Sequence, residues 1–84
     1  GFEISNITDE IRQQLDLPED LNKPLITSIE PNSLAQRSGL LEGDILLNVN
    51  GSDVESAQDV KKFLKKKSNS LRIVRNNRII VVIF

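Results

Sequence analysis

The 84-residue sequence contains no histidine and no cysteine, and it also lacks methionine, tryptophan and tyrosine. Without histidine and cysteine it cannot build a Ser-His-Asp or Cys-His catalytic arrangement, a disulfide bond, or a zinc site from the usual ligands. Carboxylate or Ser-Lys chemistry is all that is left for an enzyme, and nothing in the sequence places a hydroxyl beside a desolvated amine. We therefore expect this chain to have no active site, no metal site and no cofactor.

Aromatic residues are scarce, and acidic residues are missing from the last part of the chain. Residues 60–84 carry eight basic side chains and no acidic one, whereas residues 1–59 carry all 12 acidic side chains and three basic ones, a balance of +8 against −9. Such asymmetry can mark a nucleic-acid or anionic-membrane surface. Nucleic-acid grooves, however, combine positive charge with aromatic platforms, and only Phe63 and Phe84 lie in the basic part. We expect the two halves to pack against each other and predict no nucleic-acid partner.

Long hydrophobic runs are also absent. No stretch approaches the roughly 20 apolar residues that cross a bilayer, so we predict no direct insertion into a membrane. The sequence starts at Gly1 without an initiating methionine, which suggests a piece of a longer protein, so any targeting segment of that protein is not visible in this sequence.

Local signals predict alternating strands and helices in one domain over residues 1–84. Thr8 and Ser56 are suitable N-caps, and the turns Asn50-Gly51 and Asn76-Asn77 favour tight reversals. The expected elements are strands at 2–6, 25–29, 45–49, 71–75 and 78–84, and helices at 8–15, 34–37 and 56–67. The fold class is thus α+β but mainly β: a partly open barrel or sandwich of about five strands, capped by two to three helices.

One segment of 23 residues, from Ile29 to Gly51, carries the clearest pattern. A turn at Pro31 and a short helix containing Ala35 are followed by Gly39-Leu40, Gly43-Asp44, an apolar strand and Asn50-Gly51. This succession resembles the central signature of PDZ domains. We interpret its glycines and asparagine as residues that set backbone turns, so the pattern identifies a scaffold and not a chemistry.

The order of elements is similar to the circularly permuted arrangement of bacterial PDZ domains. Residues 7–15 and 17–20 resemble an insertion in Do-type proteases of the high-temperature-requirement (HtrA) family, and the apolar finish at Phe84 is similar to the end of those enzymes. The resemblance implies the last PDZ domain of a serine endopeptidase in the periplasm or cell envelope. Site-2 proteases, C-terminal processing peptidases and secretion components are alternative parents.

The resemblance also implies a function. PDZ domains capture the C-terminus or an extended segment of a partner, including unfolded protein, by adding it as a strand to a sheet edge beside a helix. Backbone N–H groups of a hydrophobic-Gly-hydrophobic loop hold the terminal carboxylate. Gly1-Phe2 either ends that loop, or the loop is Gly1-Phe2-Glu3-Ile4 with Glu3 in place of glycine, where its charge would repel a carboxylate.

The facing helix is expected at residues 56–67. The candidate peptide-binding residues are Gly1, Phe2, Glu3, Ile4, Ala57, Val60, Lys61 and Leu64. For the helical apolar residues a place in the core is an equal alternative, Phe63 is expected in the core, and Lys61 either points over the groove or is simply solvated. A structural role, in which the domain joins other domains or subunits of the protease and binds no peptide, is the rival hypothesis.

Overall fold

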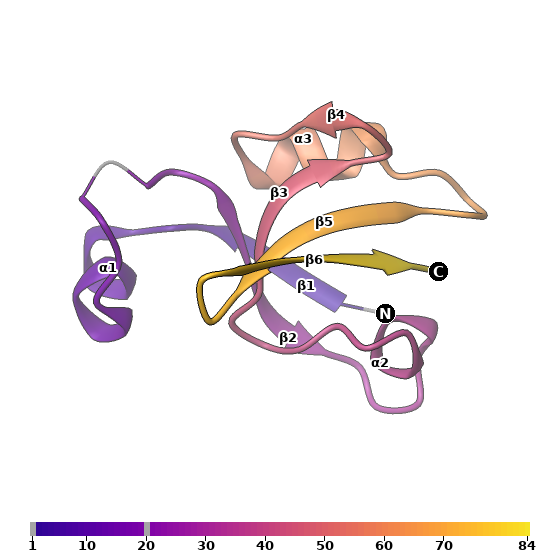
Figure 1. Ribbon diagram of the computed structural model, residues 1–84, viewed down its shortest axis with the longest axis horizontal. Coiled ribbons are helices and arrows are strands. Elements are labelled where there is room, and N and C mark those ends of the chain that lie inside the picture. Colours follow the sequence, from indigo (N-terminus) through magenta and orange to yellow (C-terminus); the bar gives the residue numbers. More distant parts are fainter. Residues whose placement is uncertain (1, 20) are drawn as a thin grey trace.

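The computed structural model describes residues 2–19 and 21–84, and in this part the chain forms one antiparallel sheet with three helices (Figure 1). The strands follow the spatial order β1-β2-β3-β5-β6, and the two-residue β4 pairs with β3. Their bounds are β1 (Phe2–Asn6), β2 (Pro24–Ile29), β3 (Ile45–Val49), β4 (Ser52–Asp53), β5 (Ser70–Arg75) and β6 (Arg78–Ile83). The helices are α1 (Asp9–Leu15), α2 (Leu34–Arg37) and α3 (Ala57–Phe63).

The predicted α+β class and order of elements are confirmed, with six strands in place of about five because of β4. The turn between β5 and β6 has positive φ angles at both Asn76 (52°) and Asn77 (63°), as a type I′ reversal requires. Gly39 has a φ of 102° and closes the turn after α2, which returns Leu40 to the core. These residues of the sequence pattern therefore form backbone turns that need positive φ angles.

Side-chain caps start the helices where the sequence predicts. The hydroxyl of Thr8 accepts a hydrogen bond from the N–H of Ile11 (3.2 Å), and the hydroxyl of Ser56 accepts one from the N–H of Asp59 (3.2 Å). These bonds satisfy N–H groups that have no partner within the helix. Both helices are therefore fixed at their first turn.

Helix α3 is shorter than predicted. It ends at Phe63, Leu64 is extended (ψ 140°), and Lys65, Lys66 and Lys67 lie in the loop that follows. The side chain of Asn69 accepts a hydrogen bond from the N–H of Lys65 (2.7 Å) and donates one to the carbonyl of Lys65 (2.9 Å). These two bonds hold Lys65 outside the helix. Lysine favours helices, but a tertiary contact overrides that preference here.

Two apolar clusters hold the fold together. The smaller one, Ile7, Leu25 and Ile45, packs under α1 together with its half-buried neighbours. The larger one fills the space between the sheet, α2 and α3 and consists of Ile26, Ala35, Leu40, Leu46, Val49, Val54, Val60, Leu71, Ile73 and Val82. Helix α3 is therefore anchored on the main core, whereas α1 stands apart at the opposite end from the two chain ends (Figure 1).

A bidentate ion pair joins β5 to the turn before β3. The Arg75 guanidinium donates to both carboxylate oxygens of Asp44 (2.8 and 2.7 Å) and to the carbonyl of Gly39 (2.7 Å). Asp44 is only 1% exposed, and its carboxylate also accepts the N–H of Leu41 (2.8 Å). The hydrogen bond to Asp44 raises the pKa of Arg75 above its ordinary value, against the opposing effect of burial. The pair fixes the entry to β3.

Within the described ranges, 2–19 and 21–84, none of the helices has the length and apolar character needed to span a bilayer.

Candidate functional site

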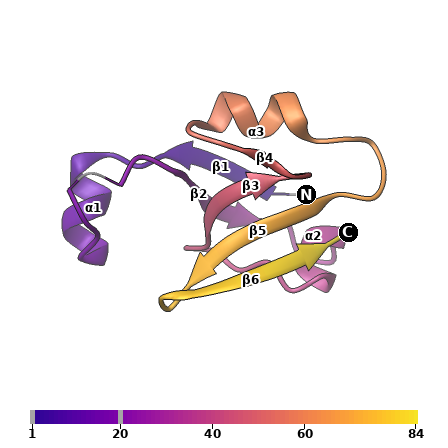
Figure 2. The same ribbon diagram turned by 45° about the horizontal axis from the view of Figure 1, so that its top comes forward.

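Strand β1 lies at one edge of the sheet and has an unpaired side. In the described part of the chain it pairs with β2 alone, and its opposite edge runs alongside α3 (Figure 2). An unpaired edge presents free backbone N–H and C=O groups, which can accept a further strand. The space between β1 and α3 is therefore the candidate site, which we call the β1–α3 groove.

The far end of the groove is closed by one hydrogen bond. The side-chain carbonyl of Asn6, the last residue of β1, accepts the N–H of Ala57, the first residue of α3, at 2.8 Å. A first-turn N–H has no partner within its helix, so this bond both caps α3 and ties it to the strand. No local sequence signal could have revealed a contact between residues 51 positions apart.

The near end of the groove opens into a hollow of about 450 Å³. Phe2, at the start of β1, and Leu64, just after α3, line it together with Phe84. Phe2 and Phe84 meet edge to face, with ring centroids 6.1 Å apart. Three consecutive lysines stand at the same hollow: Lys65, Lys66 and Lys67. Helix α3 thus runs antiparallel to β1, from a closed end at Asn6 to an apolar, positively charged hollow at Phe2.

The backbone of β1 places alternate peptide groups on the free edge. The carbonyl of Glu3 accepts a hydrogen bond from the Thr27 hydroxyl of β2 (3.4 Å), so the peptide group of Glu3 faces the sheet. The register between β1 and β2 shifts between Glu3 and Ile4, but the extra residue, Thr27, lies on β2. Peptide groups therefore still alternate along β1, and those of Phe2 and Ile4 face the groove. The side chains alternate as well: Phe2 and Ile4 are half-buried against the main core, whereas Glu3 is exposed on the outer face.

Two asparagines brace the other end of α3. The Asn50 side chain donates to the carbonyl of Phe63 (2.9 Å) and to the side-chain oxygen of Asn69 (3.1 Å), and it accepts from the N–H of Ser70 (2.8 Å). The sequence pattern predicts only a turn at Asn50. Its side chain also satisfies a carbonyl at the C-terminus of α3, where helical carbonyls lack partners.

Lys23 supports the start of α3. Its ammonium group donates to the carbonyl of Val54 (2.9 Å) and to the carboxylate of Glu55 (2.8 Å), which precede the N-cap Ser56. The Glu55 side chain is largely exposed, so the ion pair itself adds little stability. The contact instead fixes the path of the chain into α3.

The structure brings several of the predicted site residues together. Phe2 and Leu64 share the hollow, while Ala57 lies at the opposite end beside Asn6. Val60 is 0% exposed and belongs to the core, so its side chain supports α3 from beneath. Lys61 is exposed. Gly1 lies outside the described residues.

Glu3 belongs to β1 and pairs with Ser28 of β2. In the alternative in which the loop ends at Phe2, Glu3 is a strand residue, as it is in the structure. The assignment of the carboxylate loop itself stays a prediction. The segment predicted to form the facing helix is confirmed only over residues 57–63, because Leu64 is already extended.

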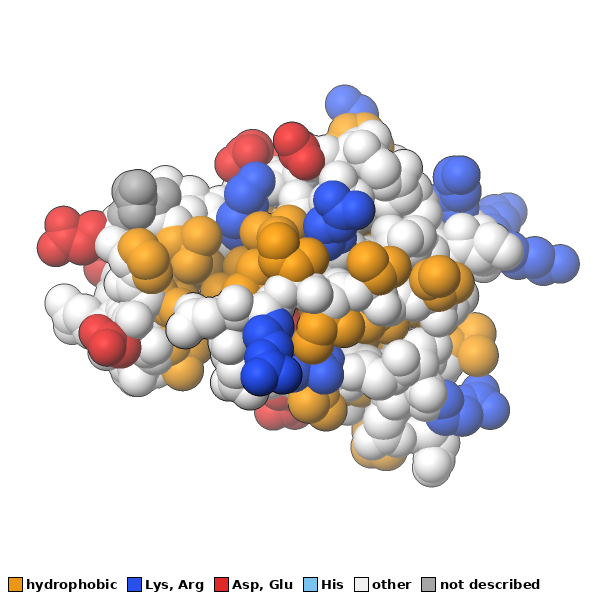
Figure 3. Space-filling view, in the orientation of Figure 1, with side chains coloured by type: hydrophobic (Ala, Val, Ile, Leu, Met, Phe, Trp, Pro, Cys, Tyr) orange, Lys and Arg blue, Asp and Glu red, His pale blue; other side chains and the backbone are white. Residues whose placement is uncertain are grey.

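A second surface feature lies on β6. Its outward-facing residues Ile79, Val81 and Ile83 are 65%, 52% and 69% exposed. Figure 3 shows a band of apolar side chains across the face on which β6 lies, with Lys and Arg side chains on both sides of it. Contiguous exposed apolar surface often marks an interaction site.

Comparison with known proteins agrees with this architecture. Residues 25–75 match the family described as the PDZ domain. The chain belongs to the PDZ family. The PDZ domain is 35% identical over 69 residues to a probable periplasmic DegP-like serine endoprotease of Chlamydia pneumoniae, which covers 82% of the chain and 14% of the relative. It is also 35% identical over 66 residues to the serine protease HTRA1 of Xenopus tropicalis, covering 77% of the chain and 14% of that protein.

Solved structures show the same PDZ fold. The HtrA3 PDZ domain bound to the phage-derived ligand FGRWV is 25% identical, covers 98% of this chain and 77% of that one, and superposes with a TM-score of 0.80. The HtrA-type protease AlgW, at 21% identity, has the same fold with a TM-score of 0.85 over 99% of this chain and 26% of that one. The predicted resemblance to PDZ domains of HtrA proteases is therefore confirmed. This PDZ domain spans about one seventh of the Chlamydia pneumoniae and Xenopus tropicalis proteases.

Proposed function

We propose that the β1–α3 groove binds the C-terminal segments of other proteins by strand addition. The observation that carries this proposal is the unpaired edge of β1, which runs beside α3 into an apolar hollow with lysines around it. Main-chain hydrogen bonds to a sheet edge supply affinity, and pockets for alternate side chains supply selectivity.

The geometry of the groove supports one direction for the ligand. Its last side chain enters the hollow beside Phe2 and Leu64, and its carboxylate lies near Lys65, Lys66 and Lys67, where positive charge favours it. The ligand then runs towards Asn6, antiparallel to β1. Its last and third-last residues exchange hydrogen bonds with the peptide groups of Phe2 and Ile4, which face the groove.

We further propose that the longer protein is a serine protease of the HtrA family in the bacterial periplasm or cell envelope, and that the domain presents or senses substrates with exposed C-termini or unfolded segments. The names and identity of both relatives support an HtrA-type protease, and the name of the Chlamydia pneumoniae relative supports the periplasm. The PDZ domain itself supplies recognition and leaves catalysis to other domains.

Titration of this domain with a fluorescent FGRWV peptide tests the groove. We expect saturable binding, together with NMR shift changes confined to β1, α3 and the hollow. Amidation of the peptide C-terminus should weaken binding at least tenfold, because it removes the charge that the hollow attracts.

N-methylation of the peptide provides a matched pair of probes. Methylating the third-last residue removes an N–H that faces Ile4 and should abolish binding, whereas methylating the penultimate residue, whose N–H points away, should change affinity less than threefold. Equal effects of the two methyl groups, or no binding of any form, would contradict strand addition at β1.

The exposed face of β6 favours a second candidate, an assembly role. In it Ile79, Val81 and Ile83 pack against a neighbouring domain of the longer protein, most of which lies outside this chain. Val81→Lys in the full-length protein should then change its oligomeric state or expose the domain to proteolysis, with Arg72→Lys as the control. An unchanged sedimentation profile and digestion pattern would remove this candidate.

A further inference from the structure

We propose that this groove selects ligands with lysine or arginine as the penultimate residue, and that Glu3 and Glu30 read that position. The inference deepens the proposed function, since it rests on strand addition to β1. It concerns the outer face of the bound strand, which neither α3 nor the hollow contacts.

Strand alternation fixes which ligand residue faces Glu3. Phe2 and Ile4 point to the core side of β1, and Glu3 points to the other side. A ligand whose last side chain enters the hollow places its penultimate side chain on the outer face, next to Glu3. Cβ atoms of directly opposed residues on paired strands lie about 4.5–5.5 Å apart, so the two side chains are within reach of each other.

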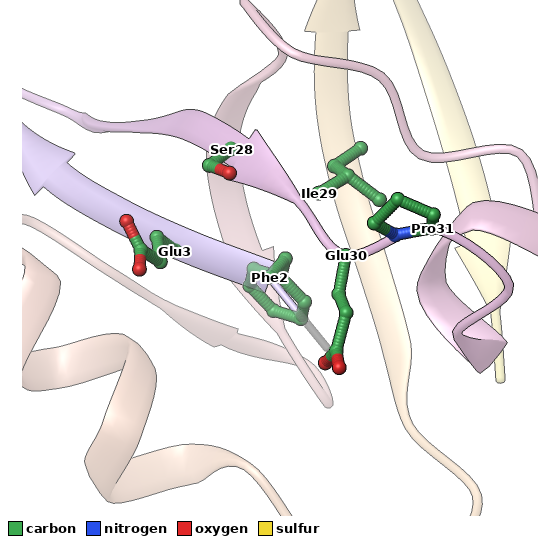
Figure 4. Close-up of a pocket in the computed structure, with 6 residues that line it drawn as sticks. All are labelled: Phe2, Glu3, Ser28, Ile29, Glu30 and Pro31. Atoms are coloured by element: carbon green, nitrogen blue, oxygen red, sulfur yellow. The ribbon is translucent and has the colours of Figure 1, made fainter.

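Glu30 supplies a second carboxylate at the same face of the near end of β1. Glu3 and Glu30 line one shallow hollow with Phe2, Ser28, Ile29 and Pro31, and Figure 4 shows the two carboxylates on either side of Phe2. Both glutamates are exposed. Among the described residues, no lysine or arginine forms an ion pair with either of them. The lysines at the near end of the groove, Lys65, Lys66 and Lys67, line instead the separate hollow beside Leu64.

This arrangement discriminates by charge. Opposite charges directly across a strand pair are favourable, and like charges are unfavourable by a similar amount. Replacing a penultimate arginine by glutamate reverses the sign of the interaction with Glu3, directly across the strand pair, and of the longer-range interaction with Glu30. The ratio of the two dissociation constants is therefore expected to be about tenfold at low salt. Because the carboxylates are exposed, the preference should shrink at high ionic strength.

The test uses three peptides that differ only at the penultimate position: FGRRV, FGRQV and FGREV. We expect affinity to fall in that order at 50 mM NaCl and the differences to narrow at 500 mM. The peptides RGRQV and EGRQV carry the same charge difference on their first residue, which faces the opposite side of the strand. The dissociation constants of these two peptides should differ less than threefold. This control separates recognition of the penultimate side chain from the effect of the peptide's net charge.

Protein variants assign the effect to its residues. Glu3→Gln and Glu30→Gln should each reduce the preference for FGRRV over FGREV at least twofold, and the double variant should remove it. Glu19→Gln makes the same change in net charge in the loop after α1 and should leave the preference intact.

The failures of the inference and of the proposed function look different. If all three peptides bind with equal affinity, or if the preference survives in the double variant, the role of Glu3 and Glu30 is overturned while strand addition stands. If none of the peptides binds, FGRWV included, the proposed function itself fails.

Discussion

Single asparagine side chains set the dimensions of the groove. Asn6 holds the start of α3 at the end of β1, and Asn69, which is 5% exposed, keeps Lys65 outside the helix. An amide can donate and accept at once, so it can satisfy backbone groups of two segments that differ in their needs. Neither residue carries a charge or a chemistry that would mark it as functional.

Replacing Asn6 tests its role as a positioning residue. Asn6→Ala leaves the Ala57 N–H without its acceptor and should destabilise the domain by about 1 kcal/mol while weakening binding of FGRWV about three- to tenfold. Asn6→Asp keeps an acceptor and should restore both values. Chemical denaturation and fluorescence polarisation give the two measurements. Unchanged peptide affinity in Asn6→Ala would show that this bond does not set the groove.

At the scale of the element, α3 shows what sequence patterns can and cannot predict. Its start was predictable because Ser56 acts on the N–H of Asp59, three residues away. Its end was not, since Asn69 and Asn50 reach it from later and earlier parts of the chain. The same distinction explains why β1 and α3 were expected to flank the site, whereas the bond between Asn6 and Ala57 was found only in the structure.

Substitution of Asn69 should loosen the C-terminal end of α3. Asn69→Ala deprives the N–H of Lys65 and the side chain of Asn50 of their buried partner, and we expect a loss of about 2 kcal/mol in the free energy of unfolding. Lys66→Ala, at an exposed neighbouring position, should change it by less than about 0.5 kcal/mol. Urea denaturation compares the two variants, and similar values for both would argue against the bracing role of Asn69.

At the scale of the whole molecule, the acidic and basic parts of the chain are joined in the sheet. Strand β3 belongs to the acidic part and β5 to the basic part, and the two strands pair directly. The ion pair between Asp44 and Arg75 spans the same junction. Part of the charge asymmetry of the sequence is therefore balanced within the fold, where the acidic and basic parts of the chain meet.

Removing Arg75 should destabilise the whole sheet. Arg75→Met leaves a nearly buried carboxylate without its cation, at an expected cost of about 3 kcal/mol. Arg72→Met, on the exposed face of the same strand, is the control and should cost less than about 0.5 kcal/mol.

Because the pKa of Arg75 is raised in the folded state, its contribution is present below its ordinary pKa and is lost only as pH rises through the raised value. The difference in the free energy of unfolding between the Arg75→Met variant and the parent domain should therefore stay constant from neutral to mildly alkaline pH. Urea denaturation at several pH values measures it, and a difference that fades within this range would contradict the assignment.

The hydrogen bond between Asn6 and Ala57 also limits the number of partner residues that can pair with β1. β1 has five residues, which at about 3.3 Å per residue offer roughly 16 Å of edge before the strand and α3 are tied together. A segment of that length holds four or five residues. The domain would thus contact only the last four or five residues of a partner and nothing of the rest of that protein. Unrelated proteins with the same C-terminal residues would therefore bind with the same affinity.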